Sequence, residues 1–156
     1  MQTRQTVITA RQRSYSDILT RRQELMLLLM ERDVIELWAK GCNREPMDSI
    51  DAQRFTSMGV CWLSHVQDTY IQYKAGLVEE EVWAAERALM SVAFNQPGFR
   101  DWWEHGQQYV SSEFAQVMEE SQPAYLVLYD PNTQTWSRPK DGKFAKDVAA
   151  RASEQG

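Results

Sequence analysis

The sequence has few of the residues that mark special classes of protein. Its 156 residues include only two cysteines, seven glycines and five prolines. Two cysteines cannot build the disulfide framework of a small secreted domain, and so little glycine and proline is unlike a fibrous or low-complexity chain. The first residues do not have the pattern of a signal peptide. These absences predict an ordinary folded protein of the bacterial cytoplasmic type.

Long apolar runs are also missing. The longest is Leu25–Met30, far shorter than the roughly 20 residues that cross a bilayer. The formal net charge is −5 at pH 7, whereas a general nucleic-acid binder is usually basic. We therefore expect no membrane span and no nucleic-acid partner.

The motifs that name a catalytic mechanism are absent as well. The sequence contains no glycine-rich phosphate loop, no Gly-x-Ser-x-Gly elbow, no Cys-x-x-Cys pair and no His-Glu-x-x-His helix. No two carboxylates are better placed than chance for acid–base chemistry. We expect no cofactor and assign no catalytic residue, which favours a role other than catalysis without excluding an enzyme.

Helical periodicity is what the sequence does contain. Residues 51–77 carry apolar or aromatic side chains at steps of three and four, which predicts a central helix half sunk in a core. Good helix formers without glycine or proline predict a long first helix over residues 3–32. Shorter helices are expected over residues 34–40 and 79–94, from Pro97 onward, and after an N-cap at Ser111 or Ser112. The predicted fold is all-α, an irregular bundle of five to six helices with a long N-terminal helix.

The composition changes in the last fifth of the chain. Residues 124–136 combine an aromatic and branched apolar run with a turn sequence, which predicts a small β-hairpin or an extended flap. Residues 140–156 are charged and alanine-rich, as in a frayed helix or a flexible tail. We divide the chain into a helical domain, residues 1–121, and a hairpin-like flap with a flexible tail, residues 122–156.

Charge is unevenly distributed along the chain. Arginines outnumber acidic residues in the first predicted helix, whereas residues 79–120 are mostly acidic. Some arginines share a heptad-spaced stripe with apolar residues. Burying an unpaired guanidinium is too costly, so each must reach solvent or meet a carboxylate. A dimer that lays the basic helix against an acidic face would satisfy them, and the residues predicted for this self-association are Arg11, Tyr15, Ile18 and Arg22.

The same charge pattern has two further interpretations. A run of charge usually forms a solvated helix surface without a special role. Anionic lipid or nucleic acid could also bind the arginines, although basic residues are too sparse to favour this.

The aromatic residues raise a separate hypothesis. Tryptophan and tyrosine supply large buried area, so core packing accounts for them without a ligand. Aromatic side chains with a few polar groups also line small-molecule pockets. If such a pocket exists, its candidate residues are Trp62, Tyr70, Tyr73, Trp83, Trp102 and Trp103.

Cys61, His65 and Asp68 share one edge of the central helix, at positions i, i+4 and i+7. Cysteine and histidine are ordinary metal ligands, and a Cys–His pair can form a thiolate nucleophile. Small and polar residues are also normal at the boundary of an apolar stripe. We therefore expect no metal site and keep these three as weak candidates.

Several features follow one another in a fixed order between Arg11 and Glu120. After the long Gln/Arg-rich helix come Leu37-Trp38 before Gly41, Tyr70-x-x-Tyr73 before Gly76-Leu77, Trp83, Pro97-Gly98 with Trp102-Trp103, and Ser112-x-Phe114. This order resembles a group of uncharacterised bacterial helical proteins, a domain of unknown function. The resemblance implies an all-helical fold and no catalytic residue. Members of that group often have a transmembrane segment before the long helix, which this sequence does not show.

Two functions follow as hypotheses. The first is a non-enzymatic interaction or scaffold protein that self-associates through its first helix as a homo-oligomer, with an unknown protein partner as a further option. The alternative is a small-molecule-binding helical protein, possibly an enzyme, with an aromatic pocket.

Overall fold

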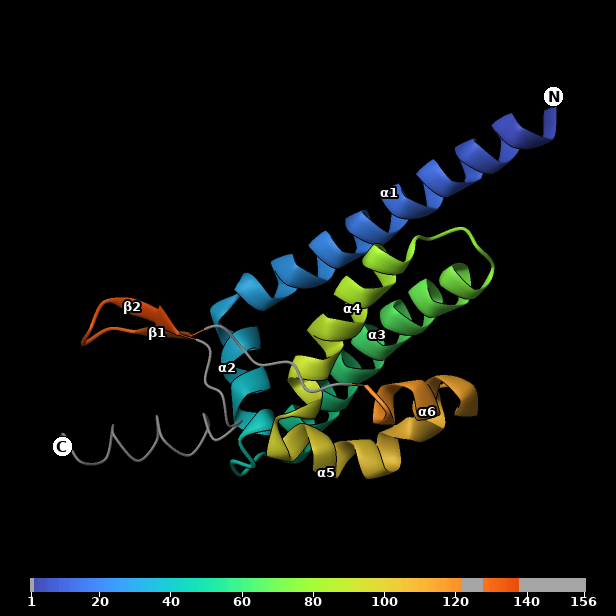
Figure 1. The fold of residues 1–156 in the computed structure, drawn as a ribbon. Coiled ribbons are helices and arrows are strands. Elements are labelled where there is room, and N and C mark those ends of the chain that lie inside the picture. Colours follow the sequence, from blue (N-terminus) through green and yellow to red (C-terminus); the bar gives the residue numbers. More distant parts are fainter. Residues whose placement is uncertain (1, 122–127, 138–156) are drawn as a thin grey trace.

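The computed structural model describes residues 2–121 and 128–137. Within these residues it consists of six α-helices, one 3₁₀ turn and one β-hairpin (Figure 1). The elements are α1 (Gln2–Met30), α2 (Arg32–Cys42), α3 (Ser49–Lys74), α4 (Glu80–Phe94), α5 (Pro97–Gly106), η1 (Gln107–Tyr109), α6 (Ser112–Glu119), β1 (Leu128–Asp130) and β2 (Thr135–Ser137). The predicted all-α bundle with a long N-terminal helix and a small hairpin is confirmed.

The central helix α3 has clear start and stop signals. The carboxylate of Asp48 accepts a hydrogen bond from the backbone N–H of Asp51 at 2.8 Å and caps the N-terminus. At the other end Gly76 adopts φ +71°, the left-handed conformation that glycine reaches without strain. The helix therefore lies two to three residues earlier than the predicted range 51–77.

The core forms around the buried stripe of α3. Tyr70 packs against Trp83 of α4 and Phe114 of α6, with ring centroids 5.1 and 5.9 Å apart. Phe94 packs edge-on against Trp103 of α5 at 4.8 Å. Such aromatic pairs contribute about 0.5–1.5 kcal/mol each beyond the area they bury. The most deeply buried side chains of the core include Leu63, Val66, Phe99, Trp103 and Phe114.

The helix α6 is held to α3 by one carboxylate. Glu113 accepts hydrogen bonds from Lys74 Nζ at 2.8 Å and from the Tyr70 hydroxyl at 2.9 Å. These bonds, first from Lys74 and then from Tyr70, lower the pKa of Glu113 below its usual range. The contact ties the short last helix to the central one.

The hairpin pairs β1 and β2 antiparallel, with Tyr129 opposite Trp136. In its turn, the backbone N–H of Asn132 donates to the carboxylate of Asp130, a local bond typical of aspartate in turns. The first half of the predicted strand and the predicted tail, residues 140–156, lie outside the described residues. The division into two domains stays a prediction.

The helices also bear on the expected lack of a membrane span. Across residues 2–121 and 128–137, no helix combines the length and apolarity that crossing a bilayer requires.

Candidate functional site

The C-terminal end of α1 exposes large apolar side chains. Residues 25–30 are all leucine or methionine, so apolar side chains surround the helix. Leu25 and Leu29 pack against the core, whereas Leu27, Leu28 and Met30 remain 61%, 57% and 77% exposed. A helix that is apolar on every side is normally buried on every side. Here the bundle covers one side only, which leaves an apolar surface on the other.

An apolar groove with a volume of about 310 Å³ lies beside this surface. This volume is at the lower end of the roughly 300–1,000 Å³ found for small-molecule pockets. Its lining comes from three helices: Leu25, Leu28 and Leu29 of α1, Val34 of α2, and Gln53, Arg54, Ser57, Met58, Cys61 and Trp62 of α3. An apolar side chain or a small apolar molecule fits such a lining.

The charged residues around the groove differ in whether they are paired. Arg54, which lines it, donates to the carboxylate of Asp33 at 3.1 Å, so its charge is already balanced. Glu24 of α1 and Glu31, just after this helix, are exposed and lie about one turn from the two exposed leucines. The α1 side of the groove is therefore acidic.

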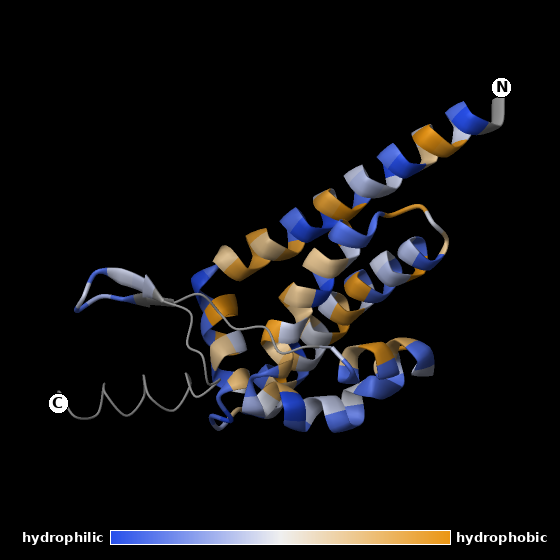
Figure 2. Ribbon diagram, in the orientation of Figure 1, coloured by the Kyte–Doolittle hydropathy of each residue, from blue (hydrophilic) through white to orange (hydrophobic). Residues whose placement is uncertain are grey.

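The opposite end of α1 projects beyond the bundle (Figure 1). Arg11 attaches the helix at the α3–α4 connection: its Nε donates to the carbonyl oxygen of Gly76 at 3.1 Å, and its Nη1 pairs with Glu79 at 3.0 Å. In the turns before Arg11, Val7 and Ile8 are 49% and 41% exposed. Figure 2 shows an apolar segment near this end, among hydrophilic ones.

A buried polar network joins α1, α3 and α4. Glu86 of α4 is fully buried; its Oε1 lies 3.0 Å from Arg22 Nη1 and its Oε2 lies 3.0 Å from His65 Nε2. The Arg22 contact is an ion pair and not a hydrogen bond, since Glu86 Oε1 has no hydrogen-bond partner among the described residues. His65 Nδ1 has no hydrogen-bond partner among the described residues. The network is a charged contact inside the core, and none of its three side chains lines the groove.

The residues predicted for self-association share one stripe of α1, and most of that stripe contacts the bundle of its own chain. Ile18 is 1% exposed and belongs to the core of its own chain. Arg11 and Arg22 meet Glu79 and Glu86 of the same chain. Tyr15 is 48% exposed. Of the four, the tyrosine is the one that presents an exposed apolar surface.

The six aromatic candidates also separate. Trp62 lines the groove, with most of its side chain buried in the core. The other five are packed in or against the core: Tyr70, Tyr73, Trp83, Trp102 and Trp103. Tyr73 stacks on Trp83 with centroids 6.1 Å apart, and the indole of Trp102 donates to the Thr56 hydroxyl at 3.2 Å. The structure therefore brings one of the six aromatic candidates to the groove.

The three weak metal candidates do not converge. Cys61 is exposed at the groove, His65 is buried against Glu86, and Asp68 pairs with Arg21 at 2.7 Å. Among the described residues, no three or more histidine, cysteine or acidic side chains are grouped as metal ligands.

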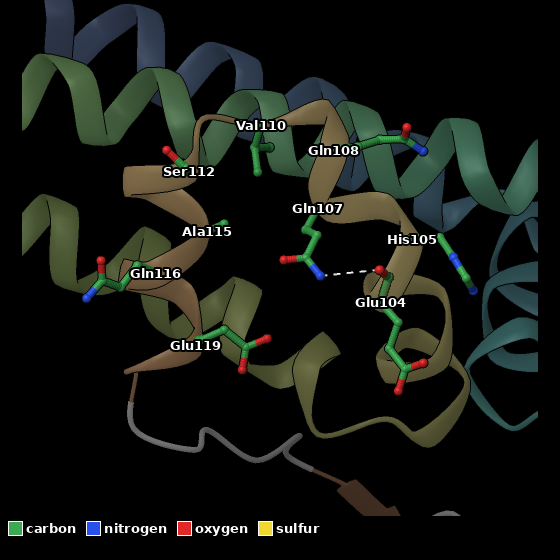
Figure 3. A pocket seen from close by; sticks show the side chains of 9 residues that line it. All are labelled: Glu104, His105, Gln107, Gln108, Val110, Ser112, Ala115, Gln116 and Glu119. Carbon is green, nitrogen blue, oxygen red and sulfur yellow. Dashed lines mark hydrogen bonds between the residues drawn. The ribbon is translucent and has the colours of Figure 1, made fainter.

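A second, open hollow of about 840 Å³ lies between η1 and α6 (Figure 3). Gln107 and Glu119 face each other across it. The Gln107 amide donates to the carbonyl oxygen of Glu104 at 3.2 Å, and Glu119 accepts from the Trp103 indole at 2.5 Å. His105 lies at its far edge. The nine lining residues contain no nucleophile paired with a base, so the hollow does not indicate catalysis.

Sequence reasoning missed Glu86 and the exposed leucines. Glu86 lies on the buried stripe of α4, between Trp83 and Met90. A carboxylate in an apolar stripe indicates a buried polar contact, so the sequence did contain this information. The apolar run of residues 25–30 was interpreted only as too short to cross a bilayer. An amphipathic helix needs apolar residues on one side only, so six consecutive apolar residues indicate that some of them face away from the core.

No protein-family model, no curated protein and no solved structure matches the chain. The resemblance to a domain of unknown function stays a prediction.

Proposed function

We propose that this is a non-enzymatic interaction protein that associates with itself through α1. The observation that supports it is the exposed apolar surface of Leu27, Leu28 and Met30 at the end of that helix. Contiguous exposed apolar surface is costly in water and marks interaction sites on folded proteins. Covering these side chains with a second copy would remove that cost. The arginine pairs within the chain do not supply the contact, so apolar burial has to.

Self-association predicts a mass above that of one chain. We expect light scattering to give a mass above 18.2 kDa that rises with protein concentration. Replacing both Leu27 and Met30 by glutamate should return the mass to one chain, because buried unpaired carboxylates would oppose the contact. Ile71→Glu is the matched control, since Ile71 is 57% exposed on α3. A single-chain mass for the unmodified protein at every concentration would contradict the proposal.

A second candidate function is the binding of a small apolar molecule in the groove. It is supported by the groove's volume of about 310 Å³ and by the indole of Trp62 in its lining. An apolar dye bound there should change the fluorescence of Trp62, and Trp62→Phe should remove that part of the change. Trp83→Phe is the control, because Trp83 is also buried in the core but does not line the groove. Equal responses in the two variants would contradict binding in the groove.

A further inference from the structure

We propose that the groove between α1, α2 and α3 receives the projecting end of α1 from a second copy of the chain. The inference rests on the proposed self-association and names its two contacting surfaces. We call the turns of α1 before Arg11 the arm, and the groove is the one lined by Leu28, Val34 and Trp62.

The arm carries apolar side chains that its own bundle does not cover. Val7 and Ile8 are adjacent, and both are close to half exposed. Arg11 attaches α1 to Gly76 and Glu79 just after them, so the arm begins where the bundle ends. Two aliphatic side chains on one helix turn suit a groove lined by leucine, valine, methionine and tryptophan.

The charges of the two surfaces are opposite. Arg4 is exposed and lies one helical turn before Ile8. Beside the groove, Glu24 and Glu31 lie about one turn from the exposed leucines of α1. Arg54 in the lining is already neutralised by Asp33, so it does not repel a basic arm. Opposite charges at the rim of a contact favour one orientation and speed association.

The arm cannot reach the groove of its own chain. α1 is one continuous helix, and Ile8 and Leu25 are 17 positions apart along it, which is about 26 Å at 1.5 Å per residue. The occupant must therefore be another molecule. Each chain offers one arm and one groove, so two copies that exchange arms form a closed dimer with the same contact made twice.

Cys61 provides a direct test, because it is exposed in the groove lining. We would introduce Ile8→Cys and follow disulfide formation under mild oxidation on non-reducing gels. Cys42 does not compete, since burial raises the pKa of its thiol to about 12 and thiolate is the reactive form. We expect a covalent dimer that is lost when Cys61→Ser is added. Ile71→Cys is the control at an exposed site elsewhere, and it should give no such dimer.

The rim charges give a second readout. Arg4→Glu should weaken self-association several-fold, and Glu24→Arg combined with it should restore the original affinity. If the unmodified protein associates but Ile8→Cys gives no Cys61-dependent dimer, arm docking is wrong while self-association stands. If light scattering shows one chain at every concentration, the proposed function itself fails.

Discussion

Glu86→Ala is expected to lower the free energy of unfolding by about 2–5 kcal/mol, because it opens a cavity in the core and removes the hydrogen-bond partner of the buried His65. Glu86 is fully buried and lies 3.0 Å from both Arg22 and His65. The variant would leave the buried imidazole of His65 facing a cavity, whereas the Arg22 side chain, 30% exposed, already reaches solvent. Urea unfolding followed by circular dichroism measures the loss, with the slope of the transition as a check on two-state behaviour.

Glu79→Ala is the matched control for this prediction. Glu79 also joins the start of α4 to α1, through Arg11 at 3.0 Å, but the two side chains are 72% and 50% exposed. Exposed ion pairs contribute at most about 1 kcal/mol. A loss for Glu86→Ala no larger than for Glu79→Ala would show that the buried network does not stabilise the fold.

The buried network also fixes which side of α1 faces outward. Arg22 shares a stripe with Ile18, Leu25 and Leu29, so its contact with Glu86 holds that stripe against the bundle. A nearly all-apolar segment has no strong rotational preference of its own, because any side could be buried. The contact of Arg22 with the buried carboxylate of Glu86 supplies such a preference, since it forms in only one rotational setting of the helix. The exposure of Leu27 and Met30 follows from this setting.

The fold was largely predictable because its helices are specified by local sequence. Hydrophobic periodicity and Pro97 indicated the order and approximate bounds of the helices. The cost of burying charge also predicted that the arginines on the α1 stripe pair with carboxylates or reach solvent. The identity of the paired carboxylates could not be predicted, because Arg22 and Glu86 are 64 positions apart and become neighbours only when the helices pack.

The candidate site was less predictable for a similar reason. The groove depends on how α1, α2 and α3 diverge, and no local pattern encodes that angle. Trp62 and Trp83 have the same spacing signal in the sequence and both belong to the buried core, yet Trp62 also lines the groove and Trp83 does not. Aromatic content therefore predicted burial but not the location of a binding surface.

The second large effect is expected for Gly98→Ala, which should lower the free energy of unfolding by about 3 kcal/mol or more. A methyl group at Gly98, in the first turn of α5, would overlap the carbonyl oxygen of Gly41 and lie 3.0 Å from that of Cys42. Overpacking a well-packed site usually costs about 1–3 kcal/mol. At Gly98 the added methyl group would meet the backbone of α2, which cannot rotate away as a side chain would. The loss of stability is therefore expected at or above the upper end of this range. Thermal and urea unfolding measure it.

Gly76→Ala is the control that separates this steric clash from the backbone strain of replacing a glycine. Gly76 needs φ +71°, but an added methyl group there would meet nothing within 4 Å. Its cost should be about 1–2 kcal/mol, from the strained conformation alone. Because α2 supplies Val34 to the groove, a shift of α5 against α2 should also weaken self-association in Gly98→Ala but not in Gly76→Ala. Equal stability losses in the two variants would mean that α5 and α2 are not in backbone contact.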